Sequence, residues 1–180
     1  MIATDAVMIV LRLFHIVGGV LWVGSAFLFV AVIGPSAAEV GPSAGPLLTV
    51  AIKKRKTSTL ITAFAISTVI AGWLMWLMNL RDLDWNVTTW VFHSGGYGLA
   101  LTIGGILATV AAYEGYWHVA RGVEGLVDLG AEMAAVEGPP PAEKIATMER
   151  IQGQVKRHGQ IDIVLLLLTV VFMATARYWP

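Results

Sequence analysis

The stretch LRLFHIVGGVLWVGSAFLFV, residues 11–30, decides the fold of this chain, because it is apolar over the length that a membrane-spanning helix needs. Such a helix takes about 20 apolar residues. The stretch nevertheless contains an imidazole, at His15. An ionisable group in an apolar run is costly unless it has a partner. We therefore expect His15 either to be hydrogen-bonded within the protein or to hold a ligand.

The composition of the whole chain is that of a membrane protein. Of 180 residues, 57% are hydrophobic and only 13% are charged, and the mean hydropathy is +0.73. Soluble domains carry about 25% charged residues. The absence of cysteine excludes disulfides, thiolate metal sites and cysteine nucleophiles. A formal net charge of zero gives no indication of a nucleic-acid partner, so the bilayer is the partner that composition predicts.

Four segments are long and apolar enough to span a bilayer: 7–33, 58–80, 88–118 and 161–177. The third segment is long, and its helix could instead begin near Tyr97. The first is not expected to be a signal peptide, because no lysine or arginine precedes it. The predicted fold is a single all-α domain over residues 1–180, a four-transmembrane-helix antiparallel bundle with a cytoplasmic helical extension between spans three and four.

The basic residues predict the orientation. Four of them lie in the loop 34–57, at KKRK, and five lie in the loop 119–157, so nine of the twelve are in two loops that share one side of the membrane. Positively charged loops stay in the cytoplasm. We therefore expect a multi-pass protein of the inner (plasma) membrane with both termini outside.

This topology sorts the four histidines into two pairs. His15 and His93 fall toward the outer side, and His118 and His158 fall toward the inner side. Neutral imidazole ligates haem iron, and two histidines at equal depth on facing helices could clamp a b-type haem. The outer pair is the first choice and requires span three to begin near Thr88. The inner pair is the second choice, because both of its histidines could simply be interfacial residues.

Other side chains could complete an outer haem site. Gly19 and Trp22 follow His15 on its face of the helix, where small residues leave room for a porphyrin. Arg12 and Arg177 fall on the outer side and could pair with propionates. Each feature also has a plainer interpretation, because glycines mediate helix packing and arginines extend to lipid headgroups.

Two further pairs have helical i, i+4 spacing near the inner side. Glu114 precedes His118 by one turn, and His158 precedes Asp162 by one turn. Each pair could handle protons or support an inner metal or haem, or could form only a hydrogen bond at a helix end. If the pairs face each other, four titratable groups gather in one place.

The pattern His15-x6-Trp22-x-Gly24, followed by Gly34-Pro35, resembles the first helix of a broad membrane superfamily. That superfamily includes copper-resistance-D-like proteins, the membrane domain of urate hydroxylase and the bacterial membrane-bound protoporphyrinogen oxidase. A small four-helix branch of it looks similar in its basic first loop, here KKRKTSTLITAFAISTVIAGWLMW, and in its last helix, here HGQIDIVLLLLTVVFMATARYW. The oxidase branch tends to carry a histidine and a lysine together early in its third helix, which HSGGYG lacks, so the sequence does not predict that activity.

The resemblance implies a helix-bundle membrane fold, a haem b cofactor and His15 as the iron ligand, with His93 as its provisional partner. The predicted function is electron transfer by a b-type haem protein, alone, as a homo-oligomer, or as a subunit or anchor of a larger redox complex. The alternative is a cofactor-free structural subunit of a membrane complex. Copper transport is a third and weaker hypothesis, because copper(I) prefers thiolates and thioethers and only Met75 and Met78 offer sulfur on span two.

Overall fold

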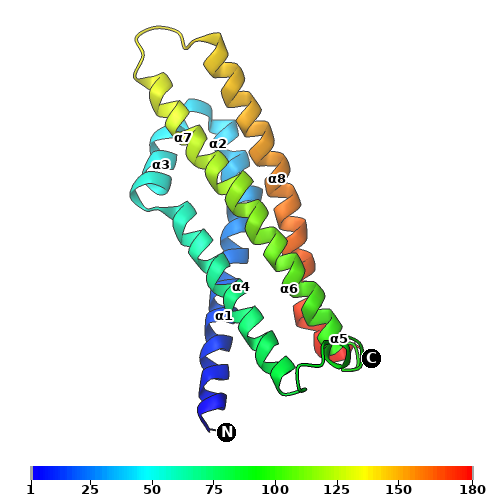
Figure 1. Cartoon of the computed structure of the whole chain (residues 1–180). Helices are drawn as coiled ribbons and strands as arrows, with labels where there is room; N and C mark the ends of the chain where they lie inside the picture. The colour runs from blue at the N-terminus through cyan, green and yellow to red at the C-terminus, as the bar shows by residue number, and fades with distance from the viewer. Residues whose placement is uncertain (1, 180) are drawn as a thin grey trace. The chain divides into compact units, whose positions relative to one another are not determined.

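The computed structural model describes the backbone of residues 2–179 and the side chains of residues 6–179, and these residues form helices and no strands (Figure 1). The α-helices are α1 (Ile2–Leu28), α2 (Gly34–Val40), α3 (Gly45–Thr49), α4 (Thr57–Arg81), α5 (Val87–Phe92), α6 (Tyr97–Glu114), α7 (Arg121–Ala134) and α8 (Ala142–Thr175). Short π-helical segments (Phe29–Ile33, Val50–Lys54, Gly115–Ala120) and 3-10 segments (Gly41–Ala44, Ala176–Tyr178) continue or connect them.

Four continuous helical stretches are long and apolar enough to cross a membrane: Ala6–Lys54, Thr57–Arg81, Tyr97–Ala134 and Ala142–Tyr178. Large apolar side chains along them are exposed, among them Phe14, Val20, Ile70, Ile106 and Leu168. Exposed apolar surface of this extent is typical of a face that contacts a membrane or another protein. The all-α class is therefore confirmed, and the four predicted apolar segments each fall within a helix of sufficient length and hydropathy to span a membrane.

The third span begins later than the range 88–118 predicts. Residues Val87–Phe92 form the separate helix α5, which Asn86 caps by accepting a hydrogen bond from the Thr89 backbone N–H. Gly95 and Gly96 then have φ angles of 63° and 73°, a left-handed conformation that ends the helix and that glycine adopts readily. Helix α6 begins only at Tyr97, so the later start is the correct one.

The chain divides into two compact units, and each long helix contributes to both. The first unit comprises residues 2–23, 63–112 and 164–179 of the described chain. Its buried core is rich in small residues, which let membrane helices approach closely: Ala65, Ala71, Ala100, Ala108 and Ala111.

Hydrogen bonds and close contacts join neighbouring helices of the first unit. The indole N–H groups of Trp73 and Trp76 on α4 donate to threonine hydroxyls on α6, each over 2.9 Å. Gly104 on α6 lies against Met173 on α8. This places the segments of α4, α6 and α8 side by side within the unit.

The second unit comprises residues 24–62 and 113–163. The predicted loop 34–57 is largely helical, because its prolines stand in the first turns of α2, α3 and the 3-10 segment, where a missing N–H costs nothing. Gly41, with a φ of 69°, supplies the break. Helix α7 packs on α8, as shown by the contact of Gly122 with Val155. The predicted helical extension between spans three and four is therefore present.

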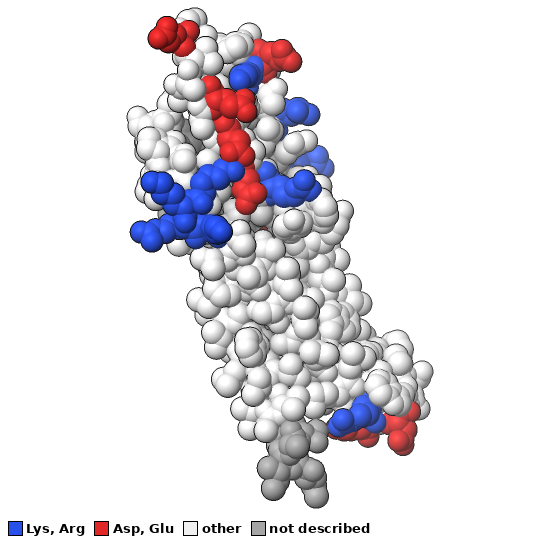
Figure 2. All heavy atoms as spheres, turned by 60° about the vertical axis from the view of Figure 1, so that its left-hand side comes forward, with Lys and Arg blue, Asp and Glu red and all other residues white. Residues whose placement is uncertain are grey.

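Charged side chains of the second unit pair with one another. Lys53 binds Asp128 on α7 over 2.8 Å, and Lys144 on α8 binds Glu132 over 3.0 Å. Figure 2 shows acidic and basic side chains next to each other on this part of the surface. Lys53 of the KKRK segment therefore pairs with an acidic residue of α7.

Candidate functional site

His15 lies on α1 in the first unit, with its ring partly buried against α4. Its Nδ1 is 2.8 Å from the backbone carbonyl oxygen of Thr68. A carbonyl oxygen only accepts, so Nδ1 carries the proton and donates it. In the neutral imidazole the lone pair is then on Nε2, which has no hydrogen-bond partner among the described residues.

A glycine on α4 makes room for this ring. A Cβ added at Gly72 would lie 2.9 Å from Cε1 and 3.0 Å from Nδ1 of His15. Next to the ring's acceptor, the buried Thr68 hydroxyl has no partner. The sequence does not single out Gly72 or Thr68. Gly72 could have been identified as a glycine inside an apolar span.

Helices α1 and α4 also line an open apolar cavity of about 260 Å³. Its wall includes Leu11, one turn before His15 on the same face of α1. The cavity is lined by Val7, Leu11, Leu74, Leu77, Met78, Arg81 and Trp85. Arg81 is the one cationic residue among the described residues of this otherwise apolar wall. Its guanidinium also binds the carboxylate of Asp82, over 3.0 Å.

The glycines predicted to leave space for a porphyrin face α4 instead. A Cβ at Gly18 would lie 2.7 Å from the hydroxyl oxygen of Thr68, and one at Gly19 would lie 3.5 Å from its methyl group. Trp22 is buried in the unit's core. These contacts are those of helix packing, and a cofactor role for Gly19 and Trp22 stays a prediction.

The structure does not bring His93 to His15. His93 caps the C-terminal end of α5, is exposed, and has Nδ1 3.2 Å from the carbonyl oxygen of Thr88. The pairing required the third span to begin near Thr88, and that requirement is not met. Arg12 and Arg177 are both exposed, and the guanidinium of Arg177 stacks over the ring of Tyr178 at 5.4 Å.

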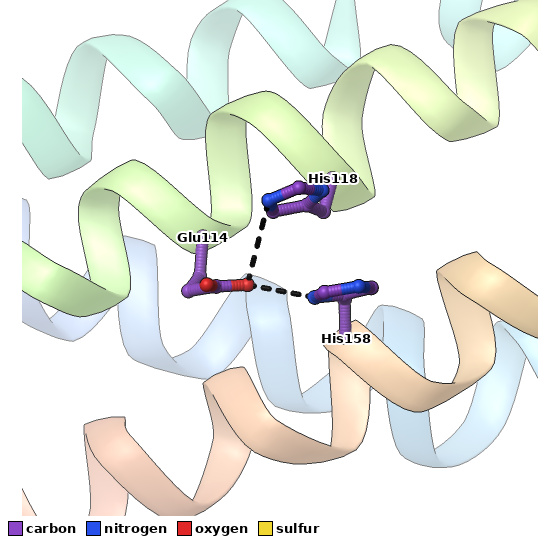
Figure 3. Close-up of side chains that lie close together, drawn as sticks. All are labelled: Glu114, His118 and His158. Atoms are coloured by element: carbon purple, nitrogen blue, oxygen red, sulfur yellow. Dashed lines mark hydrogen bonds and ion pairs between the residues drawn. The ribbon is translucent and has the colours of Figure 1, made fainter.

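The second unit holds a cluster of three side chains, Glu114, His118 and His158, which point toward one another (Figure 3). The Oε2 atom of Glu114 is 2.8 Å from Nδ1 of His158 and 4.0 Å from Nε2 of His118. The two imidazole rings are stacked, with centroids 4.1 Å apart and an interplanar angle of 15°. The side chains are 21% (Glu114), 26% (His158) and 40% (His118) exposed.

A second carboxylate lies next to this cluster. Asp162 is only 3% exposed, and its Oδ1 has no hydrogen-bond partner among residues 6–179. Its Oδ2 would be 3.4 Å from a Cβ built at Gly115, the residue after Glu114, and the two carboxylates are close enough to repel each other. The predicted gathering of titratable groups is therefore confirmed for Glu114, His118 and His158, with Asp162 adjacent.

The stacking of the two imidazole rings affects whether His118 and His158 could hold a haem between them. A haem iron held by two histidines needs the porphyrin between them, whereas these rings are in van der Waals contact face to face. In this arrangement, His118 and His158 can share a proton with Glu114. A macrocycle between the rings would require them to separate, and a shared small cation would require them to turn until their in-plane lone pairs converge.

The described chain thus has four helices long and apolar enough to cross a membrane, a half-buried histidine with one hydrogen bond in the first unit, and a histidine–carboxylate cluster in the second. Comparison of the chain with protein-family models, with curated proteins and with solved structures found no match in any of the three. The superfamily resemblance therefore stays a prediction that depends on the first helix.

Proposed function

We propose that this chain is a membrane protein that binds haem b and takes part in electron transfer, with His15 as an axial ligand of the iron. The observation that carries the proposal is the hydrogen bond from Nδ1 of His15 to the Thr68 carbonyl. Histidines that bind metals usually donate their other ring N–H to a carbonyl or carboxylate, which fixes the tautomer and the ring orientation. His15 has that arrangement, with Nε2 left for a ligand.

The surroundings of His15 suit a porphyrin in two respects. The adjacent cavity is apolar, as haem b requires of most of its surface, and it is open, so a macrocycle could extend beyond it. Arg81 in its wall is a cation to which a propionate could bind. Arg12 and Arg177 are exposed and are the further candidates for such a contact.

The bound haem would supply a one-electron iron couple. The chain's own residues would position it, exclude water and tune the iron. Thr68 would hold the imidazole of His15 in one orientation, and Gly72 would let the ring lie between α1 and α4. With His93 exposed and outside the helix, we propose His15 as the only ligand from this pair.

We propose further that the four spans pack as an antiparallel bundle in the inner (plasma) membrane. The segments that carry nine of the twelve basic residues would face the cytoplasm, and both termini would lie outside. Electron donors and acceptors would then be other membrane redox subunits, or a second copy of this chain, next to the exposed apolar faces.

The same hydrogen bond also favours a second candidate, a cofactor-free structural subunit. In that case the Thr68 carbonyl satisfies His15 without any ligand, and Gly18 and Gly72 serve only close helix packing. Copper transport has less support, because Met78 lines an apolar cavity with no other soft ligand among its walls.

Haem content distinguishes the two candidates. The full chain would be produced in membranes with haem supplied, purified in mild detergent, and its dithionite-reduced absorption spectrum recorded beside those of His15→Ala and His93→Ala. We expect a b-type spectrum in the wild type and in His93→Ala, and no haem in His15→Ala although it still inserts. A wild type without haem supports the structural subunit, and equal haem in His15→Ala excludes the proposed ligand.

A further inference from the structure

The cluster of Glu114, His118 and His158 takes no part in the proposed haem site. It belongs to the second unit, whereas His15 belongs to the first. Its side chains come from two separate stretches of chain, the end of α6 with the π-helical segment that follows it, and α8. Figure 3 shows three side chains of metal-ligating types converging on one point from two helical stretches.

Two carboxyl groups lie at this cluster with no lysine or arginine paired to them in the described part of the chain. Glu114 and the buried Asp162 are two neighbouring carboxylates, and among the described side chains, residues 6–179, neither pairs with a lysine or an arginine. Buried charges in proteins are paired or bind metal ions. These two carboxylates can be balanced by protonation of Asp162, by the imidazoles of His118 and His158, or by a cation between them.

The distances between the nitrogen and oxygen atoms of the cluster are close to those of a metal site. One ligand atom from each of the three side chains lies within 4.8 Å of the other two. With zinc–ligand bonds of about 2.0–2.1 Å, neighbouring ligand atoms of a tetrahedral site are about 3.4 Å apart. The observed separations of 2.8 Å and 4.0 Å from Glu114 Oε2 to the two histidines fall on either side of that value. The spacing therefore suits a metal ion, and binding would require the two stacked rings to turn so that their lone pairs converge.

The backbone that carries His118 is π-helical. Residues Gly115–Ala120 form a π-helical turn inside a longer helix, and the Arg121 N–H bonds back to the Tyr116 carbonyl. Such single π turns widen a helix locally and are frequent at functional sites. This turn carries His118, and it follows directly after Glu114.

We propose that Glu114, His118 and His158 bind a divalent transition-metal ion of the zinc class, with the Asp162 carboxylate beside them as an additional source of negative charge. Two imidazoles and a carboxylate are the ligand set that zinc and its neighbours accept, whereas calcium and magnesium prefer oxygen alone. Three protein ligands leave one position for water or another molecule.

The direct test uses zinc and cobalt(II) as probes with the full chain in detergent, purified with a tag that contains no histidine. Equilibrium dialysis against buffered zinc, followed by metal analysis, gives stoichiometry and affinity. We expect about one zinc per chain in the wild type. We expect affinity to fall at least about tenfold in Glu114→Gln, His118→Ala and His158→Ala. The fall should be smaller in Asp162→Asn, which removes a nearby carboxylate and no ligand.

Two variants serve as matched controls. Glu149→Gln removes an exposed carboxylate of α8, and His93→Ala removes an exposed histidine of the first unit, and both should bind zinc as the wild type does. Helical circular dichroism and size-exclusion profiles check that each variant is folded. Haem content of the same samples is measured separately, so loss of one ligand is not confused with loss of the other.

The wild type alone gives a second readout. Bound cobalt(II) should show the visible absorption of a low-coordinate nitrogen–oxygen site, and zinc should displace it. Binding of less than one zinc per chain at millimolar metal, or equal binding in wild type and all three ligand variants, would overturn the proposal. The cluster would then be a hydrogen-bonded clamp between the two helical segments.

Discussion

Replacing Gly72 by alanine tests the placement of His15 most sharply. The new Cβ would lie 2.9 Å and 3.0 Å from two ring atoms of His15, closer than real Cβ contacts are. The ring would have to move away, and Nδ1, one of the two crowded atoms, is the atom that donates to the Thr68 carbonyl, so the hydrogen bond is strained or lost. The substitution therefore changes the environment of the imidazole without touching His15 itself.

The expected loss of stability follows from three contributions. Loss of the hydrogen bond costs about 1 kcal/mol. Overpacking costs about 1–3 kcal/mol. Because alanine has the better helix propensity, it offsets this loss of stability by about 0.5–1 kcal/mol. The net expectation is a decrease of about 2 kcal/mol in the free energy of unfolding, or roughly thirtyfold in the equilibrium constant.

The assay is reversible unfolding in mixed micelles by titration with dodecyl sulfate, followed by helical circular dichroism. Gly24→Ala is the matched control, because it is also in a membrane-spanning helix and its added Cβ would meet nothing within 4 Å. That variant should be as stable as the wild type or slightly more stable. If haem binds as proposed, Gly72→Ala should also weaken it about 10–100-fold by misorienting the ligand. Gly72→Ala with the stability and haem content of Gly24→Ala would refute the reasoning.

Three further predictions use the same unfolding titration. Gly98→Ala should destabilise the protein by about 3 kcal/mol or more, since the added Cβ would meet the backbone carbonyl of Trp90, which cannot rotate away; a loss under about 1 kcal/mol would contradict this packing. Trp76→Phe should cost about 0.6 kcal/mol, the usual value of an interhelical hydrogen bond in a membrane protein, because it removes the donor to Thr102; an unchanged stability would mean that the bond is absent. Lys53→Ala should cost less than about 1 kcal/mol, because its ion pair with Asp128 is exposed; a larger loss would indicate a structural role for the KKRK segment.

The sequence predicted those features that depend on local pattern. Apolar runs of about 20 residues located the spans, and helical i, i+4 spacing placed Glu114 beside His118. It misplaced the start of the third span, because TTWVFH is apolar enough to continue a helix while the left-handed glycines after it end one. Gly95 and Gly96 were visible in the sequence, but their φ angles were not.

Features that depend on contacts between distant segments could not be predicted. The partner of His15 is a backbone carbonyl on another helix, and every residue has such a carbonyl. The hydrogen bond between Glu114 and His158 joins residues 44 positions apart. Sequence spacing shows which residues share one turn of a helix, whereas the crossing of two helices decides which of those turns meet.

The central claim is that Nε2 of His15 binds a haem iron. The most direct measurement is the amount of haem b per chain, determined as the pyridine haemochrome on wild-type protein purified from membranes that were supplied with haem. The account predicts about one haem per chain. Protein that is folded and inserted but carries none would contradict it, and the hydrogen bond to Thr68 would then be the whole role of that imidazole.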